Sequence, residues 1–139
     1  MKKNSLFISF ILIFSLIFTY CSKSTNSNSP DLKYTGEWQG FTEYNDTIKI
    51  TIGDVNGKAK ITYTSLIFPI PSGVSTISRE NSDGLGEVNN DQFSFSVQEW
   101  ENSSFHLTGE FQNEVYLEGT FIAHSSVDTT SGTYTADKK

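Results

Sequence analysis

Alternation of apolar and polar residues with a period of two constrains the fold of this chain more than any other feature. Ile48, Ile50 and Ile52 alternate with polar residues, and the same pattern recurs around Phe93 and Phe105. Successive side chains of a β-strand point to opposite faces, so each such segment predicts a strand with one apolar face. Beyond the N-terminal region, no segment of useful length has the periodicity of an amphipathic helix. The sequence therefore predicts an all-β fold.

Turn residues between these segments indicate how the strands connect. Asn56-Gly57 supplies the positive φ values that a type I′ hairpin requires. In the strand that returns from this turn, the alternation places Ala59, Ile61 and Tyr63 on one face. A two-residue turn of this kind joins antiparallel neighbours.

The predicted strands, about eight in all, are joined mostly by links of about two to five residues. Short links favour an antiparallel up-and-down meander. A sheet of this size can curl until its edges meet, which removes unpaired strand edges. We therefore expect a small closed β-barrel, with a two-sheet β-sandwich as the alternative.

Gly36-Glu37-Trp38, near the start of the first predicted strand, resembles the Gly-x-Trp opening of the calycin superfamily, which includes the lipocalins and the avidin-like barrels. The meander agrees with this resemblance over residues 34–136. The resemblance implies a lipocalin-like barrel in which Trp38 packs across the barrel floor. The chain departs from true lipocalins, because its only arginine is Arg79 and no late arginine can stack on Trp38. The resemblance carries over no binding site, since Gln39-Gly40-Phe41 follows Trp38 where an avidin has ligand residues.

The N-terminus has the layout of an exported precursor. Lys2 and Lys3 precede an uncharged run of 15 residues, Leu6–Tyr20, and the only cysteine, Cys21, follows at once. Spanning a bilayer takes about 20 apolar residues, whereas the apolar part of a signal peptide has about 7–15. The length of the run therefore favours a signal peptide.

The segment Leu16–Cys21 resembles a lipobox, the motif that is cleaved before a cysteine whose thiol carries an acyl chain. It departs from the usual motif at Phe18 and Tyr20, where a Leu and a small residue are typical. The resemblance implies a bacterial lipoprotein, with residues 1–20 as signal peptide and a palmitate-type lipid anchor on Cys21. An uncleaved signal anchor and an ordinary secretory signal are the alternatives.

Residues 21–31 are expected to be a flexible tether, because Ser22–Pro30 contains no large apolar side chain. The β-barrel domain is then expected to comprise residues 32–139. The lipoprotein reading implies a location at the bacterial cell envelope. Ser22 follows the cysteine, and in the enteric-bacterium pattern a residue other than Asp there implies sorting to the outer membrane.

The charge of the chain limits its partners. It has 10 Lys and Arg against 16 Asp and Glu, and two of the basic residues belong to the expected signal peptide. This acidic balance argues against nucleic acid, whose phosphates require a basic surface. Without a polybasic patch, we expect membrane attachment through the lipid anchor alone.

The sequence has no recognisable catalytic motif. His106 and His124 are the only histidines, and both are expected on exposed strand positions. Glu99 and Glu101 flank Trp100, but we expect a solvated loop edge rather than an acid/base pair. We therefore assign no catalytic residue, no metal site and no cofactor, and do not expect an enzyme.

One apolar stretch does not fit a plain meander. Leu66, Ile67, Phe68 and Ile70 surround two prolines, which lack the N–H needed for a sheet ladder and favour a sheet edge or a loop. These four residues are our candidates for contact with a ligand or partner. The segment would be a lid over the barrel mouth, a docking patch, or a plug that completes the core.

Two classes of function follow from these expectations. The first is a non-catalytic binding module that holds a small apolar ligand or an envelope protein at the membrane. The alternative is a structural or interaction lipoprotein with a solid core, which acts through its outer surface. An enclosed cavity the size of a ligand pocket, roughly 300–1,000 Å³, would favour the first class.

Overall fold

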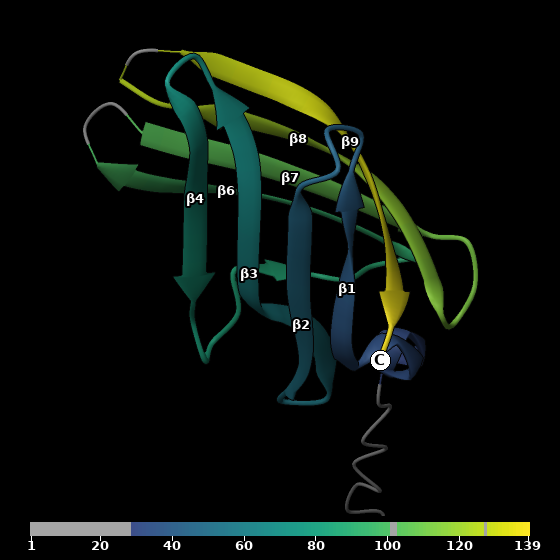
Figure 1. The fold of residues 1–139 in the computed structure, drawn as a ribbon. Helices are drawn as coiled ribbons and strands as arrows, with labels where there is room; N and C mark the ends of the chain where they lie inside the picture. Colours follow the sequence, from purple (N-terminus) through teal and green to yellow (C-terminus); the bar gives the residue numbers. More distant parts are fainter. Residues whose placement is uncertain (1–28, 101–102, 127) are drawn as a thin grey trace, which may run out of the picture.

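Most of the described chain is β-strand (Figure 1). The structure is a computed structural model that describes residues 29–100, 103–126 and 128–139. Its elements are the 3₁₀ helix η1 (Pro30–Tyr34) and the strands β1 (Gly36–Thr42), β2 (Thr47–Val55), β3 (Lys58–Ile70), β4 (Gly73–Glu80), β5 (Gly86–Glu87), β6 (Gln92–Trp100), β7 (Ser103–Phe111), β8 (Tyr116–His124) and β9 (Thr129–Lys138). The predicted all-β fold is confirmed.

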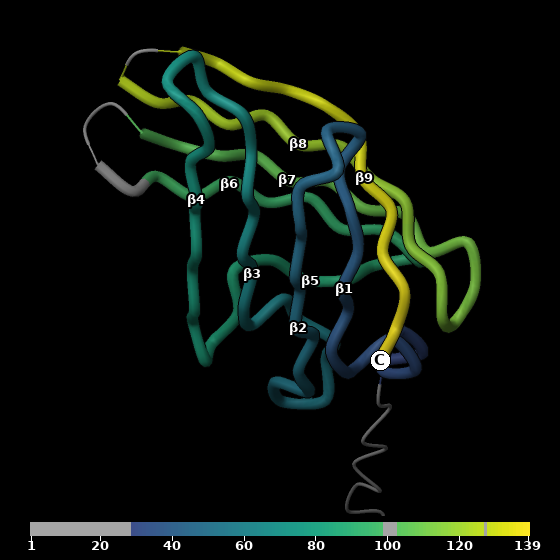
Figure 2. The backbone as a smooth tube through the Cα atoms, viewed as in Figure 1, coloured from purple at the N-terminus to yellow at the C-terminus, as the bar shows by residue number. Residues whose placement is uncertain are grey.

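The strands form a single antiparallel sheet in the order β4-β3-β2-β1-β9-β8-β7-β6, and the short β5 pairs with β3. Along the chain the strands follow one another as a meander, and β1 also pairs with β9. This pairing joins the two halves of the meander, so that the sheet curls into a barrel (Figure 2). The barrel-like prediction is confirmed, and the sandwich alternative is not formed. The barrel stays open, because β4 and β6 are the two ends of the strand order.

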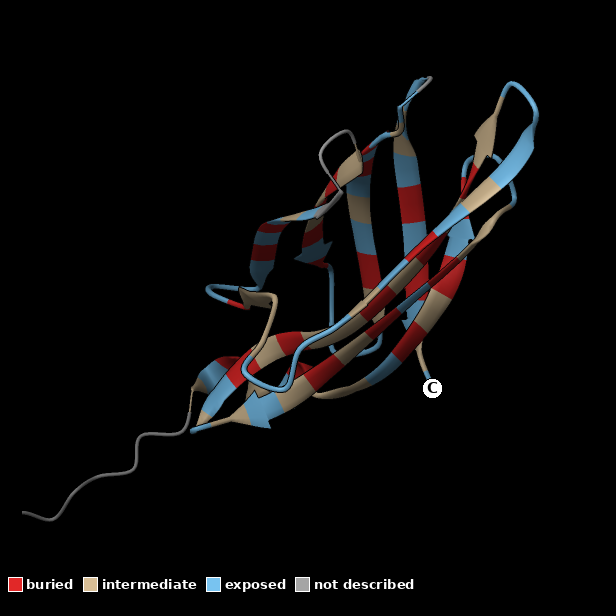
Figure 3. Cartoon of the chain, turned by 90° about the vertical axis from the view of Figure 1, so that its left-hand side faces the viewer, coloured by how far each residue is buried: buried red, intermediate tan, exposed pale blue. Residues whose placement is uncertain are grey.

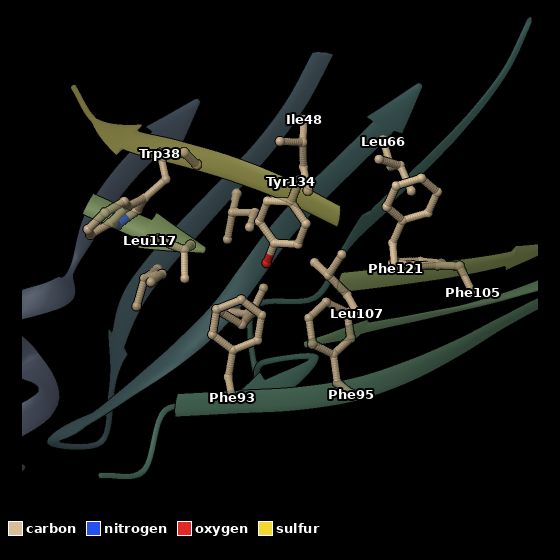
Figure 4. Close-up of a cluster of buried hydrophobic side chains, with 14 of the residues drawn as sticks. Trp38, Ile48, Leu66, Phe93, Phe95, Phe105, Leu107, Leu117, Phe121 and Tyr134 are labelled. Atoms are coloured by element: carbon tan, nitrogen blue, oxygen red, sulfur yellow. The ribbon is translucent and has the colours of Figure 1, made fainter. Parts of the chain in front are cut away.

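Buried and exposed residues alternate along the strands, as the sequence pattern predicts (Figure 3). The inward side chains from β1, β2, β3 and β9 point toward those from β6, β7 and β8 (Figure 4). Trp38, Phe105, Phe121 and Tyr134 are each no more than 2% exposed and rank among the largest buried side chains. Burial of such apolar surface is the main favourable contribution to folding.

η1 packs against one end of the barrel. Tyr34 stacks on Phe111 with ring centroids 3.9 Å apart, and the indole Nε1 of Trp38 donates a hydrogen bond to the carbonyl oxygen of Tyr34 at 2.9 Å. The chain end lies beside it, since Lys138 Nζ donates to the carbonyl oxygen of Lys33 at 2.8 Å (Figure 1). η1 therefore closes this end of the barrel before β1 begins at Gly36.

The folded part begins earlier than the expected boundary at residue 32. The backbone N–H of Ser29 donates to the carbonyl oxygen of Gly57 at 2.9 Å. Asp31, which the composition assigns to the tether, is only 5% exposed. Its carboxylate accepts a hydrogen bond from the backbone N–H of Asp91 at 3.2 Å. These contacts fix the last residues of the expected tether to the barrel.

A β-bulge in β3 changes which residues face inward. Thr51 pairs with Tyr63 and Ile52 with Ile61, so Thr62 is the extra residue. A bulge inserts one residue and reverses the alternation beyond it. Tyr63 is therefore half-buried on the outer side, and Thr64 takes the inward position. The prediction that Tyr63 shares a face with Ile61 is wrong for this reason.

Candidate functional site

The apolar segment singled out in the sequence is the end of β3 and not a loop. Leu66 is 0% exposed and Phe68 is 1% exposed, so both belong to the core. Ile70 is partly buried and packs against that core, and Ile67 is half-buried on the opposite face of the strand. Of the four candidate contact residues, the two most buried cannot reach a ligand or partner on the surface.

Pro69 fits within β3 because of its register. Its carbonyl oxygen accepts a hydrogen bond from Thr130 Oγ1 of β9 at 2.8 Å. In an antiparallel ladder the N–H and C=O of one residue point to the same side, so the nitrogen of Pro69 also points away from β4. The missing N–H therefore costs no hydrogen bond between β3 and β4.

The other candidate residues are dispersed. Trp38 is 1% exposed at the η1 end of the barrel. His106 lies on the outer face, where Ser96 Oγ is 2.8 Å from its Nδ1, and His124 is exposed with Thr129 Oγ1 2.8 Å from its Nδ1. The predicted lipidation residue Cys21 lies outside the described residues. The same is true of Glu101 and of the Glu99 and Trp100 side chains.

Within the described ranges, no three His, Cys, Asp or Glu side chains come together in a way that could hold a metal ion. In that part of the chain, no helix is both long and apolar enough to cross a bilayer.

A groove of about 670 Å³ lies on the outer face of β6, β7, β8 and β9. Its walls consist of hydroxyl, amide and carboxylate side chains that point outward from the four strands. The residues are Gln92, Ser94, Thr108, Glu110, Gln112, Glu118, Thr120, Thr133 and Thr135, with Phe93, Gly109, Gly119 and Tyr134 as floor. Sequence reasoning did not identify this site.

Two paired glycines shape the floor of the groove. Gly109 of β7 is opposite Gly119 of β8. A Cβ on Gly109 would lie 2.4 Å from the ring of Phe93, and one on Gly119 would lie 2.5 Å from the ring of Tyr134. Each aromatic ring fills the space that a side chain would occupy on the inner face, as aromatic residues do beside glycines in a sheet. The groove therefore lies above a buried aromatic layer.

Hydroxyl groups form a row across the groove. Ser94, Thr108 and Thr120 are paired in register on β6, β7 and β8, and Thr133 continues the row on β9. Thr108 Oγ1 and Thr120 Oγ1 are 2.8 Å apart, while Thr133 Oγ1 donates to Glu43 Oε2 at 3.2 Å. Such hydroxyls can both donate and accept hydrogen bonds, so the row can hold a polar ligand.

Two carboxylates stand beside this row. Glu110 of β7 is directly opposite Glu118 of β8, which places their Cβ atoms about 4.5–5.5 Å apart. Tyr116 Oη donates to Glu118 Oε1 at 3.0 Å. The pKa of Tyr116 is raised above its ordinary value, first by this hydrogen bond, then by partial burial and by the charges of Glu118 and Asp137. Negative charge therefore surrounds this end of the groove.

The groove depends on pairings that composition cannot reveal. Its outward residues are visible in the sequence as the polar half of each alternation, for example Thr133 and Thr135 around Tyr134. Polar residues at such positions are ordinary on any solvent-exposed sheet. Only the register places two glycines and two glutamates of different strands directly opposite each other.

Comparison with known proteins adds no assignment. The chain matches no protein-family model, and neither the curated proteins nor the solved structures contain a match.

Proposed function

We propose that this chain is a lipid-tethered binding module of the bacterial cell envelope, which acts through the groove on its outer face and not through an interior cavity. One observation carries this proposal: the inner face is occupied by the chain's own aromatic and aliphatic side chains, while the 670 Å³ groove opens on the outside. A volume of this size is typical of a binding site, which spans roughly 300–1,000 Å³.

The position of the groove relative to the tether agrees with this role. η1 contacts Asp91 next to the start of β6, Phe111 at the end of β7 and Lys138 at the end of β9, so the groove lies in the half of the sheet close to η1. Eight residue steps separate Cys21 from Ser29, which reach at most about 29 Å when extended. A lipid on Cys21 would therefore hold the groove near the membrane surface.

The lipid anchor is tested by metabolic labelling with a fatty acid. Wild-type protein should be labelled, and Cys21→Ala should not, because acylation requires the only thiol of the chain. Equal labelling of both would remove the lipoprotein assignment. Cys21→Ala should also move from the membrane fraction to the soluble fraction.

The groove is tested by photo-cross-linking in living cells of the bacterium that makes the protein. A photoreactive phenylalanine derivative at Thr120 would lie in the groove, and the same residue at Ser78, exposed on β4, serves as control. We expect a discrete adduct from position 120 only. A bulky Thr108→Trp substitution, which fills the groove, should abolish that adduct.

The main competing function is a carrier that encloses a small apolar ligand. Native mass spectrometry of the full-length protein, purified from membranes in detergent, distinguishes the two. The surface module is supported if the protein has the mass of the unliganded chain and position 120 gives the adduct in cells. A retained small molecule that Thr108→Trp does not displace, without any adduct, would overturn the proposal in favour of the carrier.

A further inference from the structure

The half of the sheet that carries the groove has no basic side chain except Lys138 at its very end, which contacts η1. Residues 80–137 contain 11 of the 16 Asp and Glu of the chain and not one Lys or Arg. These residues form β5, β6, β7, β8 and nearly all of β9. The outer face around the groove is therefore negative, and the basic residues of the domain belong to the other strands, to η1 and to the C-terminus.

We propose that the groove binds an extended segment of a protein partner that carries Lys or Arg, with one cationic side chain held between Glu110 and Glu118. This inference rests on the proposed function, because it names the chemistry of the ligand at the same groove. Complementary charge across an interface steers association and selects partners.

Among the described residues, no basic side chain forms an ion pair with Glu110 or Glu118. Like charges directly opposite each other on a sheet are unfavourable. Lys33 pairs with Asp91 at 3.3 Å and Lys58 with Glu87 at 2.9 Å, and neither pair involves Glu110 or Glu118. An ammonium or guanidinium group between them would relieve this repulsion and form charge-assisted hydrogen bonds.

The remaining lining fits a peptide backbone. Hydroxyl and amide groups such as Gln92, Thr120 and Thr135 supply donors and acceptors for peptide N–H and C=O groups. Four strands at about 4.8 Å spacing give a width near 15 Å, the length of four or five extended residues at about 3.3 Å each. A neutral sugar fits less well, because the floor rings of Phe93 and Tyr134 are 4% and 2% exposed and offer no face for stacking.

The lining also excludes ligands of the opposite charge. No Lys or Arg is among the residues that line the groove. Phosphorylated ligands, nucleic acids and acidic peptides would meet two carboxylates and no compensating cation among the groove-lining residues. The charge of the groove therefore selects a basic partner.

The test uses the full-length protein in detergent and a fluorescent six-residue peptide that alternates Lys and Ser. Fluorescence anisotropy should give binding that weakens as NaCl is raised, because salt screens the charges. A matched peptide with Gln in place of Lys should bind at least tenfold more weakly. The double variant Glu110→Gln/Glu118→Gln should lower the affinity for the Lys peptide at least tenfold.

A second double variant controls for net charge. Glu80→Gln/Asp83→Asn removes the same charge from exposed positions outside the groove lining, and its affinity should stay within twofold of the wild type. Both double variants should unfold at the wild-type temperature within a few degrees. Glu118→Gln keeps an oxygen that can accept the hydrogen bond from Tyr116.

Three outcomes would overturn the inference: absence of binding, equal binding of the Gln peptide, or an equal loss of affinity in both double variants. The cross-link at Thr120 separates these outcomes from the proposed function. If the adduct persists in Glu110→Gln/Glu118→Gln, the groove remains the interaction site and only the basic character of the partner is refuted.

Discussion

The hydroxyl of Tyr134 donates a hydrogen bond to the backbone carbonyl oxygen of Thr108 at 2.8 Å, and thereby links β9 to β7 across the intervening strand β8. The tyrosine passes Gly119, where any Cβ would lie 2.5 Å from its ring. Burial raises the pKa of Tyr134 well above its ordinary value, so the hydroxyl stays protonated and remains a donor. This contact sets the floor of the groove.

Tyr134→Phe should destabilise the fold. The substitution keeps the ring but removes the part-buried hydrogen bond to the carbonyl of Thr108, and a lost hydrogen bond typically costs about 0.5–1.5 kcal/mol. Urea unfolding measures the change. Tyr44→Phe is the matched control, because Tyr44 Oη donates to the carbonyl oxygen of Ser131 at an exposed position where water can replace it. Equal losses in the two variants would contradict this account.

Thr64→Val should stabilise the protein. Thr64 is fully buried, and its Oγ1 has no hydrogen-bond partner among the described residues. A methyl group in place of this hydroxyl removes an unsatisfied polar atom, so the free energy of unfolding should rise by about 1–2 kcal/mol.

Thr42→Val is the control for Thr64→Val and should have the opposite effect. Thr42 is also buried, but its Oγ1 accepts hydrogen bonds from the backbone N–H groups of Tyr44 and Asp46, each at 3.2 Å. Loss of stability in both variants would show that Thr64 has a partner after all.

Phe68 and Ile67 should differ sharply in their effect on stability. Phe68→Ala removes a ring that is 1% exposed and should cost about 3–5 kcal/mol. Ile67→Ala truncates a half-buried side chain on the outer side of the same strand and should cost much less. Thermal unfolding of the two variants tests whether the end of β3 completes the core. If Phe68→Ala lost only a little stability, this segment would have to be a lid or a docking patch instead of part of the core.

Asp91 should make the attachment of η1 sensitive to acid. Tyr34 Oη donates to its carboxylate at 2.6 Å, and this bond, followed by that of Lys33, lowers the pKa of Asp91. Because the folded-state pKa lies below the unfolded value of about 3.9, the contribution to stability is present above that pH. It is lost as the pH falls through the lower folded-state pKa.

Asp91→Asn tests this pH dependence. Asn tolerates the positive φ of 63° at this position. Urea unfolding should show the variant to be less stable than the wild type at pH 7, and the two curves should converge as the pH falls through the lowered pKa of Asp91. A difference that is independent of pH would assign the effect to something other than the carboxylate charge.

Much of the local structure could be predicted from the sequence. Asn56 and Gly57 have the expected positive φ values, 57° and 79°, and Ile48, Ile50 and Ile52 all face the core. These predictions succeed because they depend only on the conformational preferences of neighbouring residues. The face on which Tyr63 lies could not be predicted in this way, because a single-residue bulge leaves no signal in the alternation before it.

The candidate site was much harder to predict from the sequence. The prolines around Ile70 predict an interruption of the strand, but the register points the nitrogen of Pro69 away from β4, so β3 continues. The groove requires Gly109 beside Gly119 and Glu110 beside Glu118. Taken singly, none of these four residues differs from the residues that commonly occupy exposed or buried strand positions.

The sequence by itself determined that the chain is all-β and where most strands and turns lie, and it is the basis of the proposal that the N-terminus is a lipoprotein signal. These features are local, since side-chain alternation and turn chemistry act over a few residues. Only the tertiary structure decided that β1 pairs with β9, that the barrel opens between β4 and β6, and that a negative groove lies outside it. Those features depend on the register between strands far apart in the chain, which is selected by the packing of the whole core.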